Sequence, residues 1–256
     1  MGTRVGRTPA QSVVHVWLSL TVAIALTAIL FPVLPEGHVP SAIIHPAVVT
    51  GICLAGQLLY VSYSLNRPVA VQMPYSEVFG LANIATLLRG ALYAIVAGFV
   101  VVPAETALAW VPAACYGVGV ILDQLDGTLA RTISGETALG TRLDKAFDTF
   151  GFVVAPLVAV LWGMLPAYYL TISAARYVFV GAVRLHRWRG GTVHSLPDSN
   201  LGRYLAGLQM AFITVALVPA VSTAHVFSVA PLVLAPSIAV FVRDYYHATG
   251  RLGGAY

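Results

Sequence analysis

The stretch LDQLDGTLARTISGETALGTRLDKAFDTF, residues 122–150, gathers carboxylates in a chain that is otherwise rich in apolar residues. It includes four aspartates, Asp123, Asp126, Asp144 and Asp148, among the ten acidic residues of the chain. The 256 residues are 58% hydrophobic and 9% charged, whereas a soluble domain carries about 25% charged residues. The composition therefore predicts an integral membrane protein. An aspartate inside a membrane costs roughly 2.5–3.5 kcal/mol, so a cluster of four predicts a functional site.

The apolar segments of the chain predict its fold class. A membrane-spanning helix needs about 20 mostly apolar residues. Eight segments satisfy this, at about 12–34, 42–63, 80–102, 106–130, 142–164, 166–185, 201–220 and 224–243. Alternation typical of strands is absent, and connections rich in Pro and Gly separate the segments. We therefore expect an all-α integral membrane protein with about eight transmembrane helices.

The basic residues predict which face of the membrane each connection occupies. With eight helices, every Lys and Arg except Arg89 and Arg176 lies near a terminus or an even-numbered connection. The odd-numbered connections, PEGHVPS, VPAET, LPA and VSTAH, carry neither residue type. Because cytoplasmic loops are enriched in Lys and Arg, both termini and the acidic stretch are expected on the cytoplasmic side of the cytoplasmic membrane. No basic run is dense enough to predict nucleic-acid binding.

Helical spacing predicts that the four aspartates meet. Asp123 and Asp126 share one face of the fourth predicted helix, and Asp144 and Asp148 share one face of the fifth. The short ISGE connection predicts an antiparallel hairpin, so the two acidic faces would repel each other. Divalent cations between the helices would offset that repulsion, and carboxylate oxygens suit Mg²⁺ or Mn²⁺. Four aspartates are enough for two ions about 3.5–4 Å apart.

Three neighbouring residues predict a phosphate-binding site beside these carboxylates. Gly127 and Gly140 leave backbone exposed, so that a phosphate or a nucleotide can approach closely. Arg131 supplies a permanent positive charge for a phosphate oxygen. Together with two metal ions, these residues are typical of displacement at a phosphoryl group.

The motif D-x2-D-G-x2-A-R-x8-G-x3-D-x3-D resembles the signature of the CDP-alcohol phosphatidyltransferases. Its fixed positions are all matched, by Asp123, Asp126, Gly127, Ala130, Arg131, Gly140, Asp144 and Asp148. The run LANIATLLRG resembles the N-x-x-T-x-x-R run of the family's first core helix, through Asn83, Thr86 and Arg89. The resemblance implies a six-helix catalytic core at 79–245. A membrane extension of two helices with its connector, 1–78, would precede this core, and a cytoplasmic tail, 246–256, would follow it.

The resemblance also implies a reaction in phospholipid biosynthesis. The family transfers a phosphatidyl-type group from a CDP-lipid or other CDP-alcohol to the hydroxyl of an acceptor alcohol, and CMP leaves. By this resemblance Asp123, Asp126 and Asp144 bind metal, while Asp148 completes the second metal site and acts as the general base. The residues implied in binding CDP and phosphate are Gly127, Ala130, Arg131, Gly140, Asn83 and Thr86. The implied partners are a CDP-lipid, an acceptor alcohol that is either small or a lipid, and membrane lipid.

Several residues have both a functional and a structural interpretation. Arg142, Lys145 and Arg176 are candidates for binding an anionic acceptor, but they also fit a boundary or snorkelling role. Arg89 is either functional or a structural partner of the aspartates. The two leading helices are expected to provide packing, or contacts in a homodimer, and no chemistry. Cys53 and Cys115, which lie in apolar segments, are expected to be buried thiols.

Two other functions also place acidic residues in a membrane protein. An intramembrane prenyltransferase also uses Asp-rich motifs, Mg²⁺ and a lipid pyrophosphate, but its N-D-x-x-D-x-x-x-D pattern with a distant D-x-x-x-D is not found here. An ion transporter with an aspartate ion site would predict broken helices or repeated halves, and the sequence shows neither.

Overall fold

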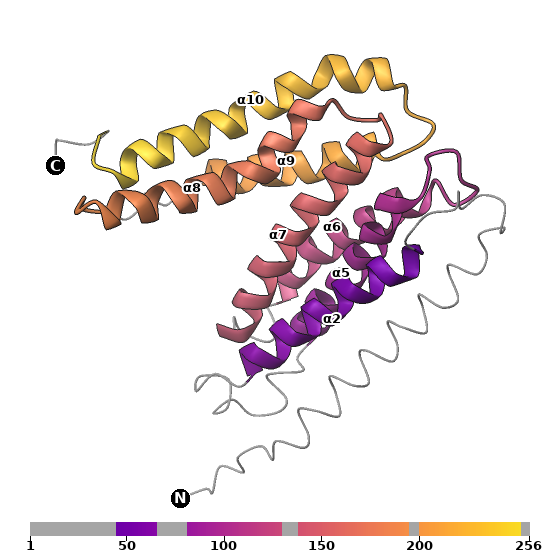
Figure 1. Ribbon diagram of the computed structural model, residues 1–256, viewed down its shortest axis with the longest axis horizontal. Helices are drawn as coiled ribbons and strands as arrows, with labels where there is room; N and C mark the ends of the chain where they lie inside the picture. The colour runs from indigo at the N-terminus through magenta and orange to yellow at the C-terminus, as the bar shows by residue number, and fades with distance from the viewer. Residues whose placement is uncertain (1–44, 66–80, 130–137, 195–199, 252–256) are drawn as a thin grey trace, which may run out of the picture. The chain divides into compact units, whose positions relative to one another are not determined.

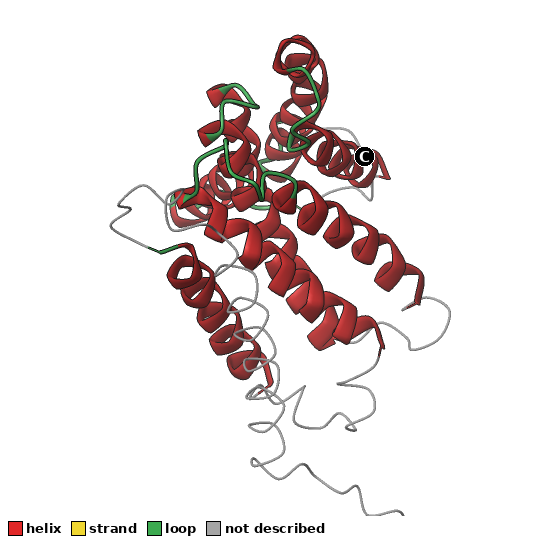
Figure 2. Cartoon of the chain, turned by 90° about the vertical axis from the view of Figure 1, so that its right-hand side faces the viewer, coloured by secondary structure: helices red, strands yellow, loops and turns green. Residues whose placement is uncertain are grey.

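The computed structural model describes residues 45–65, 81–129, 138–194 and 200–251 (Figure 1). Within these ranges the chain is helical, and Figure 2 shows no strand. The first predicted segment, at about 12–34, lies outside the described residues, whereas the other seven correspond to helices. The α-helices are α2 (Pro46–Leu65), α5 (Leu81–Gly98), α6 (Val111–Leu129), α7 (Ala138–Leu161), α8 (Thr171–Trp188), α9 (Asn200–Ala216) and α10 (Thr223–Ala248). Two 3₁₀ turns, η2 (Phe99–Val101) and η4 (Ala167–Leu170), extend α5 and precede α8. The all-α prediction is confirmed for the described residues.

The helices have the length and composition of membrane segments. Three of those described are long and apolar enough to cross a membrane: Pro46–Leu65, Asn83–Val101 and Thr223–Ala248. Val111–Leu125 and Leu201–Ala216 are shorter apolar helices. These helices support an integral membrane protein. In contrast, α7 and α8 carry several charged residues within their bounds, and the charges of α7 include two aspartates of the acidic stretch.

The chain divides into two compact units, residues 1–158 and 159–256. In the first unit α5 packs along both α2 and α6. The N-terminal half of α7 joins them, since Leu143 and Phe147 pack against Val61 and Leu65 of α2. The core of this unit therefore includes side chains from α2, α5 and α7.

Two glycines set how closely α6 and α7 approach α5. The ring of Tyr93 on α5 is fully buried and lies 5.2 Å, between ring centroids, from Tyr116 of α6. A Cβ atom added at Gly151 of α7 would lie 2.5 Å from that ring, and one added at Gly119 of α6 would also collide with it. Small residues at helix contacts are the usual means of close packing in membrane proteins. Tyr93 is four residues after Arg89, so the same contacts fix the helices next to the acidic stretch.

In the second unit a buried glutamine joins three elements. α10 packs against α8 and α9. Gln209 of α9 accepts a hydrogen bond from the Tyr169 hydroxyl of η4, and it donates to the Val233 carbonyl at 2.8 Å and the Ser237 hydroxyl at 2.9 Å. Each polar group of this network has a partner, as burial among apolar side chains requires.

Substitution of Gly151 by Ala should destabilise the first unit. The buried Tyr93 ring has no space to move, so the added methyl group must separate helices, at a cost of about 1–3 kcal/mol. Gly56→Ala on α2 is the matched control, because no atom of the described residues lies within 4 Å of a Cβ atom at that position. Thermal melts of the purified protein should show a lower Tm for Gly151→Ala than for Gly56→Ala. Equal melting temperatures would contradict the close packing described for Tyr93.

Candidate active site

Three of the four predicted aspartates come together in the first unit. Asp123 lies on α6, and Asp144 and Asp148 lie on successive turns of α7. One carboxylate oxygen from each of these residues lies within 4.8 Å of the other two. All three residues are partly exposed. The acidic faces of the two helices therefore meet, as the spacing of the sequence predicts.

A buried arginine from α5 lies among these carboxylates. Arg89 has 0% of its surface exposed, and its guanidinium group forms ion pairs with Asp123, Asp144 and Asp148. The contact between Nη2 of Arg89 and Oδ1 of Asp148 is 3.2 Å, and Nη2 also lies 3.4 Å from the carbonyl oxygen of Asp144. A buried charge is stable only when it is paired, and Arg89 has three partners from two other helices.

The contacts of Arg89 leave ligand capacity on the carboxylates. Each of the three ion pairs uses the Oδ1 atom of its aspartate. An ionised carboxylate has two oxygens and about four lone-pair sites, so one contact with Arg89 does not saturate it. The side-chain amide of Gln124 approaches Oδ2 of Asp123 at 3.4 Å. Arg89 thus orients the three carboxylates without preventing them from binding another cation.

Local packing explains why α7 reaches Arg89. The residue after Arg89 is Gly90, where an added Cβ atom would lie 3.0 Å from the buried ring of Phe147. The absence of a side chain at Gly90 lets Phe147 rest against α5. Phe147 is adjacent in sequence to Asp148, so this contact brings the acidic face of α7 to the guanidinium group. The side chain of Gln57 on α2 donates a hydrogen bond to the Gly90 carbonyl at 3.0 Å.

The other residues of the predicted motif have different placements. Asp126 and Gly127 belong to the last turns of α6, but the side chain of Asp126 lies outside the described part of the structure. Ala130 and Arg131 lie outside the described residues. Gly140 is in the first turn of α7, one turn before Asp144, and is partly buried.

The remaining candidates lie on α5, α7 and α8. Asn83 and Thr86 are buried on α5. They lie three residues apart, and Arg89 follows Thr86 after another three residues. Arg142 and Lys145 are exposed on α7, and among the described residues neither forms an ion pair with an aspartate of the cluster. Arg176 is partly exposed on α8 and belongs to the second unit.

Sequence reasoning left the role of Arg89 undecided, and the structure makes it the partner of three aspartates. A signal was present: Arg89 is a single basic residue inside an apolar segment, and such a residue requires a countercharge. The acidic stretch was the only place in the sequence where several carboxylates were gathered. These two facts together could have identified the pairing before the structure did.

A comparison with family models agrees with this geometry. The model described as CDP-alcohol phosphatidyltransferase matches residues 79–247. The chain belongs to the CDP-alcohol phosphatidyltransferase family. The resemblance seen in the sequence is confirmed, and the match runs from the residues just before α5 into the last turn of α10. No curated protein and no solved structure matches the chain.

Membership of this enzyme family decides between the reaction classes. The match includes the whole acidic stretch, Asn83, Thr86 and Arg89. The chain is therefore a transferase of the CDP-alcohol phosphatidyltransferase family, whose members act on a CDP-alcohol and an acceptor alcohol. The prenyltransferase and transporter alternatives find no support in this comparison.

The carboxylates of this family enzyme suit a divalent cation. Asp123, Asp144 and Asp148 provide three hard oxygen donors close enough to share one ion. Among these four described groups, three carboxylates against the single positive charge of Arg89 leave two negative charges. A divalent cation would balance them.

Replacement of Arg89 by Met should destabilise the protein in a way that depends on divalent cations. The loss of one partner from a buried charge network costs about 3–5 kcal/mol. Mg²⁺ should restore much of this loss, because it supplies the missing positive charge to the three carboxylates. The measurement is Tm in excess EDTA and in Mg²⁺, for wild type and for the Arg89→Met and Arg89→Lys variants.

Arg184→Met is the matched control, since Arg184 is exposed on α8 and forms no ion pair with a carboxylate among the described residues. It should show little change in either buffer. Arg89→Lys keeps the charge and should fall between wild type and Arg89→Met in EDTA. An Arg89→Met variant that melts like Arg184→Met in EDTA would show that Arg89 does not hold the carboxylates together.

Proposed function

We propose that this enzyme transfers a phosphatidyl-type group from a CDP-lipid to the hydroxyl of an acceptor alcohol, in a step of phospholipid biosynthesis. The bond between the lipid-bearing phosphorus and the CMP oxygen breaks, and a bond from the acceptor oxygen to the same phosphorus forms. The acceptor hydroxyl loses its proton, and CMP leaves. The observation that carries this proposal is the cluster of Asp123, Asp144 and Asp148 around Arg89, inside the part of the chain that the family model matches.

The proposed metal ligands are the four aspartates of the motif, Asp123, Asp126, Asp144 and Asp148, with two ions of Mg²⁺ or Mn²⁺. When bound, such ions offset the charge of the diphosphate and of the leaving CMP. The proximity of three of these carboxylates supports the assignment. Asp126 follows Asp123 by three residues on α6, which supports its placement on the same face of that helix.

Asp148 is the proposed general base. The family resemblance gives this role to the fourth aspartate of the motif. In this chain Oδ1 of Asp148 lies 3.2 Å from Arg89, which restrains the orientation of the carboxylate. The Oδ2 atom is then the one we expect to take the proton of the acceptor hydroxyl. A base that is held in position by a buried arginine does not have to be reoriented during the reaction.

The substrate-binding residues are proposals that follow the same resemblance. Gly127, Ala130, Arg131, Gly140, Asn83 and Thr86 are assigned to CDP and its phosphates. The burial of Asn83 and Thr86 on the helix that carries Arg89 supports a place near the carboxylates. Arg142, Lys145 and Arg176 are the candidates for an anionic acceptor. The exposure of Arg142 and Lys145 supports their access to a soluble anion such as a sugar phosphate.

We further propose that eight helices span the cytoplasmic membrane, with both termini and the active site on the cytoplasmic side. Residues 79–245 would form the six-helix core, residues 246–256 the cytoplasmic tail, and residues 1–78 an extension that contributes packing or homodimer contacts. The start of the family match at residue 79 supports the first of these boundaries. The concentration of Lys and Arg in alternate connections supports the orientation.

Turnover should depend on divalent cations and on Asp148. Purified enzyme with a radiolabelled CDP-lipid and a panel of alcohols should release CMP in Mg²⁺ or Mn²⁺ but not in excess EDTA. Asp148→Asn should reduce turnover by at least ~10² while CDP binding, measured by calorimetry at saturating metal, changes little. In sealed vesicles, CMP should appear outside only when the cytoplasmic face is outward.

Asp244→Asn is the control, because Asp244 on α10 is also an aspartate beside an arginine, but it lies outside the motif. It should keep normal turnover. Full activity in EDTA would overturn the metal-dependent mechanism. Near-normal turnover of Asp148→Asn would refute the base assignment, and loss of CDP binding together with turnover would make Asp148 chiefly a metal ligand.

A further inference from the structure

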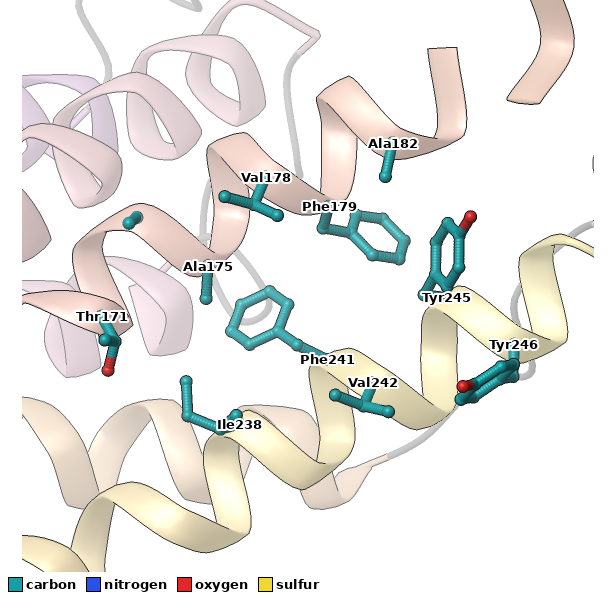
Figure 3. Close-up of a pocket in the computed structure, with 11 residues that line it drawn as sticks. Thr171, Ala175, Val178, Phe179, Ala182, Ile238, Phe241, Val242, Tyr245 and Tyr246 are labelled. Atoms are coloured by element: carbon teal, nitrogen blue, oxygen red, sulfur yellow. The ribbon is translucent and has the colours of Figure 1, made fainter. Parts of the chain in front are cut away.

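The second unit contains an apolar slot between α8 and α10, and none of its lining residues is assigned to the proposed reaction (Figure 3). Its volume is about 520 Å³, which is within the range of small-molecule sites. No charged side chain from the described part of the chain lines it. All of its lining residues belong to α8 and α10, whereas Asp123, Asp144 and Asp148 belong to the first unit.

The slot exists because small side chains on one helix face large ones on the other. Ala175 and Ala182 of α8 face Phe241 and Tyr245 of α10, and Figure 3 shows the rings directed into the space between the helices. The rings of Phe179 and Phe241 lie 6.3 Å apart between centroids, so they touch without filling the slot. An alanine side chain does not reach across to the facing helix, and space therefore remains along this face of α8.

One end of the slot carries aromatic residues that are typical of a membrane surface. Tyr245 and Tyr246 line that end, and Trp188, the last residue of α8, is 83% exposed. Tyr and Trp are enriched where the hydrocarbon of a membrane meets the lipid headgroups. The apolar part of the slot would then lie at the depth of acyl chains.

Two arginines follow the helices at this same end. Arg189 comes seven residues after Ala182, so helical geometry places it on the slot side of α8. Arg251 comes shortly after α10. The ends of the two helices are joined, because the His194 backbone N–H donates to the Ala248 carbonyl at 3.0 Å. Both arginines are exposed, and neither forms an ion pair with a carboxylate in the described ranges.

We propose that the slot between α8 and α10 binds an acyl chain of an anionic membrane phospholipid, whose phosphate contacts Arg189 and Arg251. An apolar slot that ends at two exposed arginines, neither paired with a carboxylate of the described residues, is complementary to a molecule with a long apolar chain and an anionic phosphate. Arginine binds phosphate through parallel hydrogen bonds, and basic residues at the cytoplasmic surface attract anionic lipids. The lipid is a resident of the second unit and not the reacting CDP-lipid, so this proposal does not rest on the proposed function.

Native mass spectrometry of the full-length protein in detergent tests the proposal, with phosphatidylglycerol and phosphatidylcholine as probes. Wild type should bind phosphatidylglycerol in preference to phosphatidylcholine. The double variant Ala175→Leu with Ala182→Leu fills the slot and should weaken phosphatidylglycerol binding by at least ~5-fold. The double variant Arg189→Gln with Arg251→Gln leaves the slot intact. It should weaken phosphatidylglycerol binding by a similar factor and so remove the preference for the anionic lipid.

Gly181→Leu is the control, because it adds a leucine side chain to α8 at a position where no atom of the described residues lies within 4 Å of a Cβ atom. It should bind phosphatidylglycerol like wild type. The two arginines are exposed, so replacing them should not disturb folding, and this variant tests the proposal even if the leucine variant does not fold. Unchanged phosphatidylglycerol binding in the arginine variant would overturn the proposal. A leucine variant whose oligomeric state changes while its phosphatidylglycerol binding does not would also overturn it. The same holds if CDP-lipid displaces all bound phosphatidylglycerol from wild type.

Discussion

The arrangement of the first unit depends on one buried ion-pair network, in which Arg89 of α5 meets carboxylates of α6 and α7. An arginine with no exposed surface, in a segment able to cross a membrane, must find its countercharges inside the protein. The three aspartates have the converse requirement, because their mutual repulsion needs a cation. The buried guanidinium and the clustered carboxylates are each unfavourable without the other. The helices α5, α6 and α7 must therefore meet where these groups lie. The contacts of Phe147 with Gly90 and of Tyr93 with Gly151 bring the helices close enough for that meeting.

The same network explains how a chemical site persists in an apolar protein. Arg89 offsets one of three negative charges, holds each carboxylate by one oxygen, and leaves negative charge that a divalent cation would offset. A cluster without the arginine would be far less stable when no metal is bound. A cluster with a second arginine would have little need for a metal. The balance of one guanidinium and several carboxylates therefore suits a protein that folds without metal and can still bind a divalent cation.

Much of this could be predicted from the sequence, and the exceptions have physical reasons. Long apolar runs predicted the helices, and fixed spacing predicted that Asp123, Asp144 and Asp148 converge. Boundaries were less accurate: α10 continues to Ala248, five residues beyond the predicted 243, and ends next to Gly250, whose φ of 70° suits a helix C-terminus. The partnership of Arg89 and the slot along α8 depend on which side chains from distant segments face each other. Hydropathy and spacing do not carry that information.

We expect the carboxylates gathered around Arg89 to bind the cation that contacts the phosphates of the CDP-lipid. Electron–nuclear double resonance of Mn²⁺ in the purified enzyme, with CDP-lipid bound, tests it directly. Coupling between the Mn²⁺ electron spin and a ³¹P nucleus of the substrate should be present in wild type and in Asp244→Asn. This coupling should be lost in Asp144→Asn. The same ³¹P coupling in Asp144→Asn as in wild type would show that these carboxylates do not hold that cation.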